Sequence, residues 1–209
     1  MEGHKFVIFE GGEGSGKDTQ IDFLKEHFSG RPGVTFTREP GGTEMGEKIR
    51  ALVLDKASAG MAPETELLLF LSARAQLLNE VIKPKLDRGE TVISNRFGLS
   101  TIAYQIYGRQ RPEYLDFLRK ASEFVVGKYT PTLTVLFDVD PTVGIRRVNQ
   151  RADANTRFDD EKLEFHRRVR EGFLEHVGEY GDHVVIDAGK TIEEVRAEVL
   201  HTLSSRGIQ

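Results

Sequence analysis

The 209 residues include no cysteine and no tryptophan. Without cysteine, a disulfide-stapled secreted module, a thiolate zinc site and a thiol nucleophile are all excluded. Long apolar runs are also missing, because the longest, residues 67–71, is far too short to span a membrane. The first residues lack a basic segment followed by an apolar one, so we expect no signal peptide.

Neither sign of charge is in large excess. Lysine and arginine total 29, aspartate and glutamate total 33, and the net charge is −4. A surface that coats nucleic acid needs an excess of basic residues, so we expect no nucleic-acid partner. The length suits one domain, and no repeat, low-complexity tract or linker marks the start of a second. We therefore expect residues 1–209 to form a single soluble, cytoplasmic domain with no membrane contact.

Short apolar runs rich in β-branched residues alternate with longer amphipathic stretches. The runs predict strands at residues 6–9, 34–37, 91–94, 133–137 and 184–186. Helical spacing predicts helices at residues 18–28, 64–86, 140–149, 161–177 and 192–203. Pro84 is expected to kink or end the second helix, because it has no N–H. The alternation indicates parallel βαβ units and a three-layer α/β domain.

A glycine-rich segment joins the first predicted strand to the first predicted helix. It reads Gly11, Gly12, Glu13, Gly14, Ser15, Gly16, Lys17, Asp18, Thr19. Glycines let backbone N–H groups turn toward a phosphate, the helix N-terminus adds positive charge, and the lysine reaches the β- and γ-phosphates. An ordinary strand–helix turn is the alternative, but the position and the Gly-Lys pair favour a phosphate-binding loop, or P-loop, at residues 11–18.

The loop departs from the usual pattern G-x-x-x-x-G-K-S/T at its last position. Asp18 stands where a hydroxyl normally ligates Mg²⁺. A carboxylate is a hard ligand that can bind Mg²⁺ directly or through water, but it also brings negative charge toward the phosphates. Thr19 is one residue late and faces another direction on the helix.

Two further segments suggest an acceptor site. The segment 37–43 contains Glu39 and Pro40 and follows the second strand, at the sheet edge where ligands bind in open α/β folds. Phe70 and Arg74 share a helix face, and an aromatic plane beside a guanidinium suits a nucleobase. Taken alone, Phe70 is more typical of a core residue.

The end of the third strand contributes a third group of polar residues. Arg96 is a fixed cation suited to a phosphate. Thr101, Tyr104 and Gln105 follow at helical spacing and form one polar face beside the strand end. We expect this face to complete the acceptor pocket.

A basic segment lies later in the chain. It contains Arg146, Arg147, Arg151 and Arg157 around a stretch of polar turn residues. A charge cluster is usually a solvated loop. The functional alternative is a lid, at about residues 147–158, whose arginines neutralise charge on the transferring phosphoryl group.

These motifs, in this order, resemble the thymidylate kinase family of the bacterial type over essentially the whole chain. Further matching positions are Phe165, His166, Val169, Arg170, Glu171, Gly172, Phe173, Asp187 and Ala188. The resemblance implies a three-layer P-loop NTPase fold with a central, about five-stranded parallel sheet flanked by helices. It also implies phosphorylation of dTMP to dTDP with Mg-ATP, in dTTP biosynthesis, by a homodimer.

The resemblance implies a role for each matching position. Those implied to hold ATP are Gly11, Gly12, Glu13, Gly14, Ser15, Gly16, Lys17, Asp18, Thr19, Arg147 and Lys190. Those implied to hold dTMP are Glu39, Pro40, Arg50, Phe70, Arg74, Arg96, Ser100, Thr101, Tyr104 and Gln105. The implied catalytic residues are Glu13, Lys17, Arg96, Arg151 and Arg157, and the implied Mg²⁺ ligands are Glu13 and Asp18.

Within the acceptor pocket, the resemblance implies that Phe70 stacks on thymine and that Arg50 and Arg96 grip the phosphate. Tyr104 would crowd the 2′ position and favour deoxyribose. Gly14 takes the place of an arginine found in the eukaryotic form. Members with glycine there supply catalytic arginines from the lid, a pattern that Arg151 and Arg157 fit.

Two positions depart from the family. Its members commonly have serine or threonine at position 18 and aspartate at position 95, where this chain has Asp18 and Asn95. Our hypothesis is that one carboxylate has moved from the third strand to the P-loop, which keeps the charge of the site constant. Tolerance of variation at these positions, or an impaired enzyme, are the alternatives.

Other functions remain open from the residues alone. A deoxynucleoside kinase would need a carboxylate base after the second strand, and Glu39 lies there. Another nucleoside monophosphate kinase, or a non-catalytic nucleotide-binding relative, would keep the P-loop. The arginines Arg50 and Arg96 favour an acceptor that already carries a phosphate.

Overall fold

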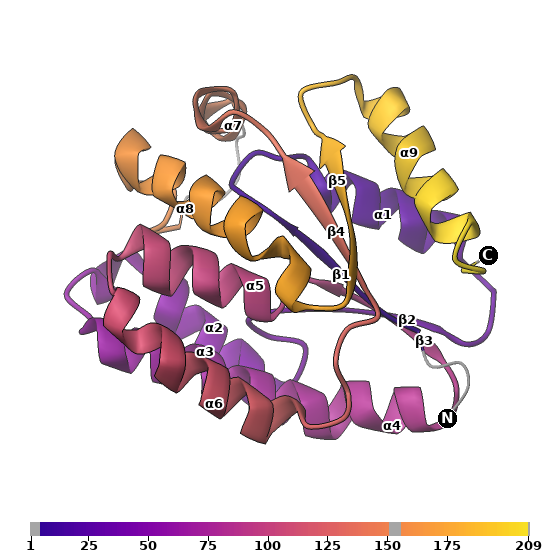
Figure 1. Cartoon of the computed structure of the whole chain (residues 1–209), viewed down its shortest axis with the longest axis horizontal. Coiled ribbons are helices and arrows are strands. Elements are labelled where there is room, and N and C mark those ends of the chain that lie inside the picture. The colour runs from indigo at the N-terminus through magenta and orange to yellow at the C-terminus, as the bar shows by residue number, and fades with distance from the viewer. Residues whose placement is uncertain (1–4, 151–155, 209) are drawn as a thin grey trace.

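The computed structural model describes residues 5–150 and 156–208. Within these residues, five strands form a sheet in which every neighbouring pair is parallel and the order is β2-β3-β1-β4-β5 (Figure 1). The strands are β1 Lys5–Gly11, β2 Val34–Arg38, β3 Thr91–Asn95, β4 Leu133–Asp138 and β5 Asp182–Asp187. All the predicted strands and the three-layer α/β architecture are confirmed.

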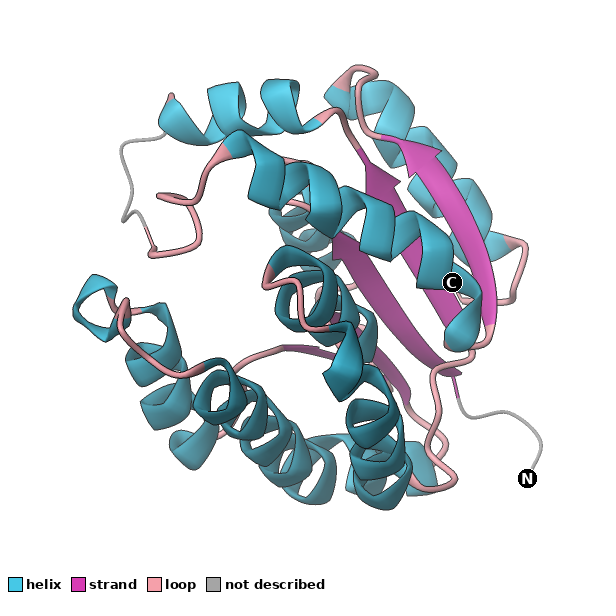
Figure 2. Ribbon diagram, turned by 60° about the vertical axis from the view of Figure 1, so that its left-hand side comes forward, coloured by secondary structure: helices cyan, strands magenta, loops and turns pink. Residues whose placement is uncertain are grey.

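Helices cover both faces of the sheet (Figure 2). They are α1 Lys17–His27, α2 Glu44–Leu54, α3 Pro63–Leu77, α4 Lys83–Asp87, α5 Gly98–Thr101, α6 Leu115–Val126, α7 Pro141–Asn149, α8 Leu163–His176 and α9 Ile192–Ser204. Two wider π-helical segments are η2 Leu78–Ile82 and η3 Ile102–Gly108, and three short 3₁₀ turns are η1 Lys56–Ser58, η4 Pro112–Tyr114 and η5 Val177–Glu179. The helices α2 and α6 were not predicted.

Alternation along β1 builds a hydrophobic core on each side of the sheet. Val7 and Phe9 are fully buried in one cluster with residues of α1 and α9. Phe6 and Ile8 point the other way, into a second cluster with residues of α3, η2 and α4. A strand sends successive side chains to opposite faces, so an unbroken apolar run becomes the centre of a three-layer domain.

The long predicted helix at residues 64–86 continues past Pro84. It contains α3, then the π-helical segment η2, then α4, with Pro84 in the first turn of α4. Proline has no N–H to donate, and the wider turn of η2 supplies the change of hydrogen-bond pattern that lets the helix continue. Of the two expected outcomes, Pro84 therefore does not end the helix.

The strand order places the functional end of the sheet. The chain passes from β1 toward β2 and β3 on one side, and later returns to β4 and β5 on the other side. The carboxyl end of β1 therefore lies at the point where the order reverses. Ligands of open α/β sheets bind at such a point.

The start of α7 shows why that helix begins where it does. The Asp140 carboxylate accepts a hydrogen bond of 2.8 Å from the backbone N–H of Thr142, and Pro141 occupies the first turn. Both features are favoured at a helix N-terminus. As a result α7 directly follows β4 and packs over the P-loop.

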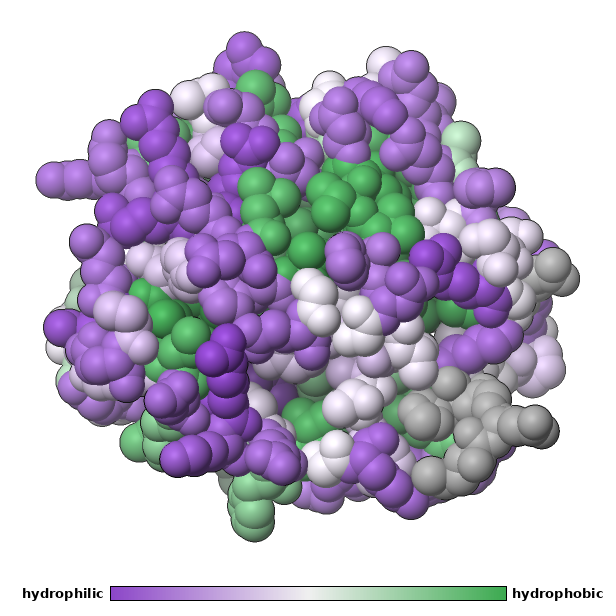
Figure 3. Space-filling model, viewed as in Figure 1, coloured by the Kyte–Doolittle hydropathy of each residue, from purple (hydrophilic) through white to green (hydrophobic). Residues whose placement is uncertain are grey.

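The face seen in Figure 3 is largely polar, with apolar side chains gathered beside the edge strand β5. Val185 of β5 is 45% exposed. None of the described helices has the length and apolar composition that crossing a membrane requires.

Candidate active site

The P-loop runs from the end of β1 into the first turn of α1, as its sequence predicted. Gly14 and Gly16 adopt left-handed backbone angles, with φ of 67° and 77°. Lys17 is the first residue of α1 and is almost completely buried. Burial, and the nearby Arg96, lower the pKa of Lys17 to about 8. A phosphate placed here would meet a desolvated ammonium group and a helix N-terminus.

The helix α7 packs directly against the P-loop. A Cβ at Gly14 would lie 2.1 Å from the Gly144 carbonyl oxygen, and a Cβ at Gly144 would lie 2.3 Å from the Glu13 carbonyl oxygen. Neither position has room for a side chain, so an arginine at position 14 is incompatible with this packing. Arg147 of the same helix donates to the Gly14 carbonyl at 3.3 Å and to the Ala188 carbonyl at 2.9 Å.

A buried carboxylate that sequence analysis missed lies under the loop. Glu10 of β1 is fully buried and accepts hydrogen bonds from the backbone N–H of Phe97 at 2.8 Å and from the Ser100 hydroxyl at 2.5 Å. Burial raises the pKa of Glu10 to about 7. The only sequence feature that pointed to Glu10 is its position, as a charged residue directly after the apolar run 6–9. It fixes the start of α5 against β1.

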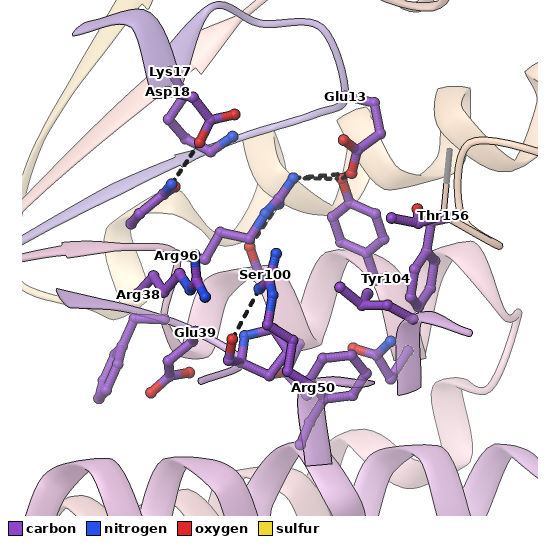
Figure 4. A pocket seen from close by; sticks show the side chains of 18 of the residues that line it. Glu13, Lys17, Asp18, Arg38, Glu39, Arg50, Arg96, Ser100, Tyr104 and Thr156 are labelled. Carbon is purple, nitrogen blue, oxygen red and sulfur yellow. Dashed lines mark hydrogen bonds and ion pairs between the residues drawn. The ribbon is translucent and has the colours of Figure 1, made fainter. Parts of the chain in front are cut away.

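Glu13 and Arg96 form the ion pair nearest the acceptor side of the P-loop. Arg96 Nη2 donates to Glu13 Oε1 at 2.9 Å, and the Tyr104 hydroxyl donates to the same oxygen at 2.7 Å (Figure 4). Burial opposes ionisation of Glu13, but Arg96 and Lys17 hold its pKa below the ordinary value. Arg96 has a φ of 71°, unusual for a residue other than glycine, and such strain is typical of functional sites.

The two positions at which we expect a departure from the family pattern lie in direct contact. Asn95 Nδ2, at the end of β3, donates to Asp18 Oδ1 at 2.6 Å (Figure 4). Positions 18 and 95 therefore form one pair at the carboxyl end of the sheet, as the hypothesis of a moved carboxylate requires.

A cavity of about 340 Å³ opens beside the P-loop and joins the two halves of the site. Every residue predicted for the acceptor lines it: Glu39, Pro40, Arg50, Phe70, Arg74, Arg96, Ser100, Thr101, Tyr104 and Gln105. Glu13, Lys17 and Asp18 line its P-loop end. Segments far apart in the sequence thus meet in one cavity.

One end of the cavity is built for a planar polar group. Arg74 is 1% exposed and donates from Nε to Glu39 Oε2 at 2.8 Å and from Nη2 to Thr101 Oγ1 at 2.7 Å. Its Nη1 and Glu39 Oε1 are buried without a hydrogen-bond partner among the described residues. Phe70 is half-buried beside them, so it presents part of its ring to the cavity.

The same cavity also concentrates positive charge. Lys17, Arg38, Arg50 and Arg96 all line it, and the Arg50 guanidinium is held by a 2.8 Å hydrogen bond from Nη1 to the Pro40 carbonyl. Burial, together with Arg38, lowers the pKa of Arg50. Cations crowded in this way favour an anionic ligand. Arg38 was not predicted as a site residue, although it lies in the segment 37–43.

Other predicted residues lie outside this cavity. Gly11, Gly12, Gly14, Ser15, Gly16 and Arg147 belong to the P-loop side, where Thr19 is exposed on α1. Lys190 is exposed and paired with Glu198. Arg157 is buried and forms an ion pair with Glu66 of α3, and Arg151 lies outside the described residues. Phe158, which sequence analysis missed, also lines the cavity.

The sheet order, the P-loop and the cavity that faces it define a P-loop phosphotransferase with a second pocket for a phosphorylated acceptor. A model of the thymidylate kinase family matches residues 9–199. The thymidylate kinase of Deinococcus radiodurans is 43% identical over 97% of each chain, and that of Carboxydothermus hydrogenoformans is 45% identical over 93% of this chain and 94% of its own. The chain belongs to the thymidylate kinase family.

A solved structure agrees with this assignment. The crystal structure of thymidylate kinase from Ehrlichia chaffeensis covers 96% of this chain and 99% of its own, with a TM-score of 0.74 and 33% sequence identity. The predicted P-loop fold is confirmed by this likeness together with the parallel sheet.

Proposed function

We propose that this protein transfers the γ-phosphoryl group of ATP to dTMP, which yields ADP and dTDP for dTTP biosynthesis. The observation that carries the proposal is the shared cavity, which links Lys17 of the P-loop to a buried arginine and an aromatic ring. Membership of the thymidylate kinase family supports the same acceptor.

The reaction needs positioning more than covalent help. The acceptor nucleophile is a phosphate oxygen, already ionised at neutral pH, so no strong base is required. In this proposal Arg50 and Arg96 hold the acceptor phosphate, while Lys17 stabilises charge on the phosphoryl group in transit. Glu13 fixes Arg96 by their ion pair. Such fixed charges lower the barrier because they need no reorganisation during transfer.

The base end supports a thymine ring. Phe70 supplies a stacking surface, and Arg74 supplies donors for a ring carbonyl. Arg74 Nη1 is buried and has no hydrogen-bond partner among the described residues. Because buried donors are normally satisfied, we propose that it donates to an oxygen or nitrogen atom of the bound base. Thr101, Tyr104 and Gln105 line the same cavity, where Tyr104 would crowd the 2′ position of the sugar.

We also propose that Mg²⁺ binds at Asp18. Mg²⁺ is usually held by one or two carboxylates together with substrate phosphates and water, and it neutralises phosphate charge when bound. Asp18 supplies one hard carboxylate oxygen, oriented by Asn95. The described residues contain no group of three acidic or histidine side chains that would bind a metal alone, which fits a site completed by ATP. Glu13 remains a predicted ligand, although Arg96 and Tyr104 occupy its Oε1.

A nucleoside kinase is less well supported. Its carboxylate base would be Glu39, but Glu39 Oε2 is held by Arg74 Nε at 2.8 Å, and burial raises the pKa of Glu39. The arginines Arg50 and Arg96, which line the same cavity, would have no acceptor phosphate to bind. The base pocket itself argues against a non-catalytic nucleotide-binding relative.

Binding without ATP tests the proposal. We expect dTMP to bind the isolated protein with a clear calorimetric signal, and thymidine and dCMP to bind at least tenfold more weakly. Equal binding of thymidine and dTMP would contradict recognition of the acceptor phosphate and would favour the nucleoside kinase.

The remaining predictions concern the whole protein. We propose that residues 1–209 form one thymidylate kinase-like domain, located in the cytoplasm, and that Arg151 and Arg157 belong to its lid. We further propose a homodimer. Phe117 and Phe124 of α6 are seven residues apart and therefore lie on one helix face. They are 50% and 89% exposed in the single chain, as expected of a surface that a second copy covers in the dimer.

A further inference from the structure

Glu66 of α3 is a buried carboxylate that no part of the proposed reaction uses. Its side chain is 1% exposed. Glu66 Oε1 accepts from Gln105 Nε2 at 2.9 Å and from Arg109 Nε at 3.2 Å. Glu66 Oε2 accepts from Arg109 Nη2 at 3.1 Å and forms an ion pair with Arg157 Nη2 at 2.5 Å. One carboxylate therefore joins α3 to η3 and to the end of the predicted lid.

The two arginines on Glu66 also hold an aromatic ring. The guanidinium carbon of Arg157 lies 4.8 Å from the centre of the Phe158 ring, and that of Arg109 lies 5.4 Å from it. Arg157 is fixed at its other side by a hydrogen bond from Nε to the Val53 carbonyl at 2.5 Å. Cation–π contacts of buried guanidinium groups restrict a ring more firmly than exposed ones.

Phe158 forms a wall of the acceptor cavity. It lines the cavity together with Phe70 and Tyr104. Its ring centre lies 6.4 Å from that of Phe70 and 5.7 Å from that of Tyr104. Gln105, the fourth side chain in this group, is 3% exposed and lines the cavity too. Two base-end groups, Gln105 directly and Phe158 through the arginines, are thus held by Glu66.

The charges of this network balance only when Glu66 is present. Arg109 pairs with both Glu66 and Glu161, and Arg157 pairs with Glu66, so two cations face two carboxylates. Without the Glu66 charge, Arg109 would keep Glu161 as a partner, while the buried Arg157 would lose the carboxylate with which it pairs. Because a buried charge without its partner is costly, the arginines and the ring between them would move.

We propose that Glu66 is a positioning residue for the acceptor nucleobase, one that holds Gln105 and the Phe158 wall in place. This inference rests on the proposed function, because it assumes that the base end of the cavity binds the acceptor base. Glu66 does not contact the P-loop in this structure, and its effect should therefore fall on the acceptor and not on ATP.

The variant Glu66→Gln tests the proposal. It keeps the size of the side chain but removes its charge. We expect KM for dTMP, and Kd for dTMP without ATP, to rise about tenfold or more, while KM for ATP stays within twofold. Equal rises in both KM values, or no change in either, would overturn the proposal.

The matched control is Glu179→Gln, since Glu179 of η5 also joins two basic side chains, Arg119 and His176, but lines no part of the cavity. We expect it to leave both KM values unchanged. If Glu66→Gln does not fold, Arg109→Lys decides by the same criteria, because lysine keeps the charge but loses the two-pronged contact.

A double-mutant cycle measures the coupling between two substitutions in dTMP affinity, which a purely structural role of Glu66 would not produce. Phe158→Leu and Glu66→Gln should be strongly non-additive in dTMP affinity, since both act on the same wall, and additive effects would overturn the proposal. Acceptor binding by the wild-type protein separates the proposed function from the positioning role of Glu66. If it binds another acceptor in place of dTMP, the proposed function fails, and that acceptor replaces dTMP in the same comparison.

Discussion

Asp18 and Asn95 are the two residues at which the sequence was expected to depart from the family pattern. Their 2.6 Å contact means that Asn95→Asp alone would place two carboxylates against each other. We expect that variant to lose at least about tenfold in kcat/KM for Mg-ATP, because like charges at this distance repel. The double variant Asp18→Ser/Asn95→Asp should recover part of the loss. The measurement is turnover against Mg²⁺ concentration, and strict additivity of the single effects would contradict the exchange.

Glu10 should make stability depend on pH. Burial raises its pKa from 4.5 to about 7 in the folded protein. Between these values the folded state retains a proton that the unfolded state has released, so stability falls as pH rises through this window, by about 3 kcal/mol at most. Below pH 4.5 and above pH 7 the contribution is constant.

Urea unfolding of the wild type and Glu10→Gln at pH 4.5 to 7.5 measures this effect. The free energy of unfolding of the wild type should decrease relative to the variant across the series. Parallel curves would mean that Glu10 does not titrate in the folded state within this range.

The predicted positions of single residues agree with the structure where local spacing carried the information. Phe70 and Arg74 share a helix face four residues apart, and both line the cavity. Glu66 and Phe158 escaped prediction because their significance arises from contacts between distant segments, such as the hydrogen bond from Gln105 to Glu66 across 39 positions. A glutamate in a helix and a phenylalanine in a loop have no local signal for such roles.

At the scale of elements, the contact of α7 with the P-loop sets a steric limit. Gly144→Ala would place a methyl group 2.3 Å from the Glu13 carbonyl oxygen, so helix and loop must separate. Overpacking of this kind costs about 1–3 kcal/mol, which predicts roughly a 5- to 150-fold rise in KM for ATP with a smaller effect on dTMP binding.

Gly60→Ala is the matched control for this prediction, since nothing lies within 4 Å of its Cβ position. Steady-state kinetics with each substrate varied in turn would check both variants. An unchanged KM for ATP in Gly144→Ala would show that the loop does not depend on this contact.

Elements were predictable to different degrees. The strands are short runs rich in apolar or β-branched residues, and all of them were found. The helices α2 and α6 were missed although their apolar residues recur at helical spacing. The π-helical segments were missed because their wider turn has no simple sequence signature. Even so, η3 brings Tyr104 and Gln105 into the cavity, so the predicted polar face was sound although the helix type differed.

At the scale of the whole molecule, the proposed homodimer can be measured directly. The chain has a mass of 23.5 kDa, and sedimentation at micromolar concentration should give about twice that value. Substitution of Phe117 and Phe124 by aspartate should shift the protein to monomer, because the charges would be buried. Leu174→Asp on α8, at an exposed apolar side chain elsewhere, should not. A monomeric wild type would contradict the proposal.

The order of strands and helices along the chain was enough to predict the architecture of the molecule, because parallel βαβ units have few arrangements. The shared cavity that links the P-loop to the acceptor site was not predictable, since it depends on how α2, α3 and residues 156–159 pack around the carboxyl edge of the sheet. That packing is what turns a P-loop into a site for two substrates.

The most direct test of the central claim is ADP release from Mg-ATP in the presence of dTMP, dUMP, thymidine, dCMP, dGMP or no acceptor. We predict turnover that depends on dTMP and far exceeds that with dCMP or dGMP. Turnover with thymidine in place of dTMP would contradict the claim and assign a nucleoside kinase, and silence with every acceptor would place the fault at Asp18 and Asn95.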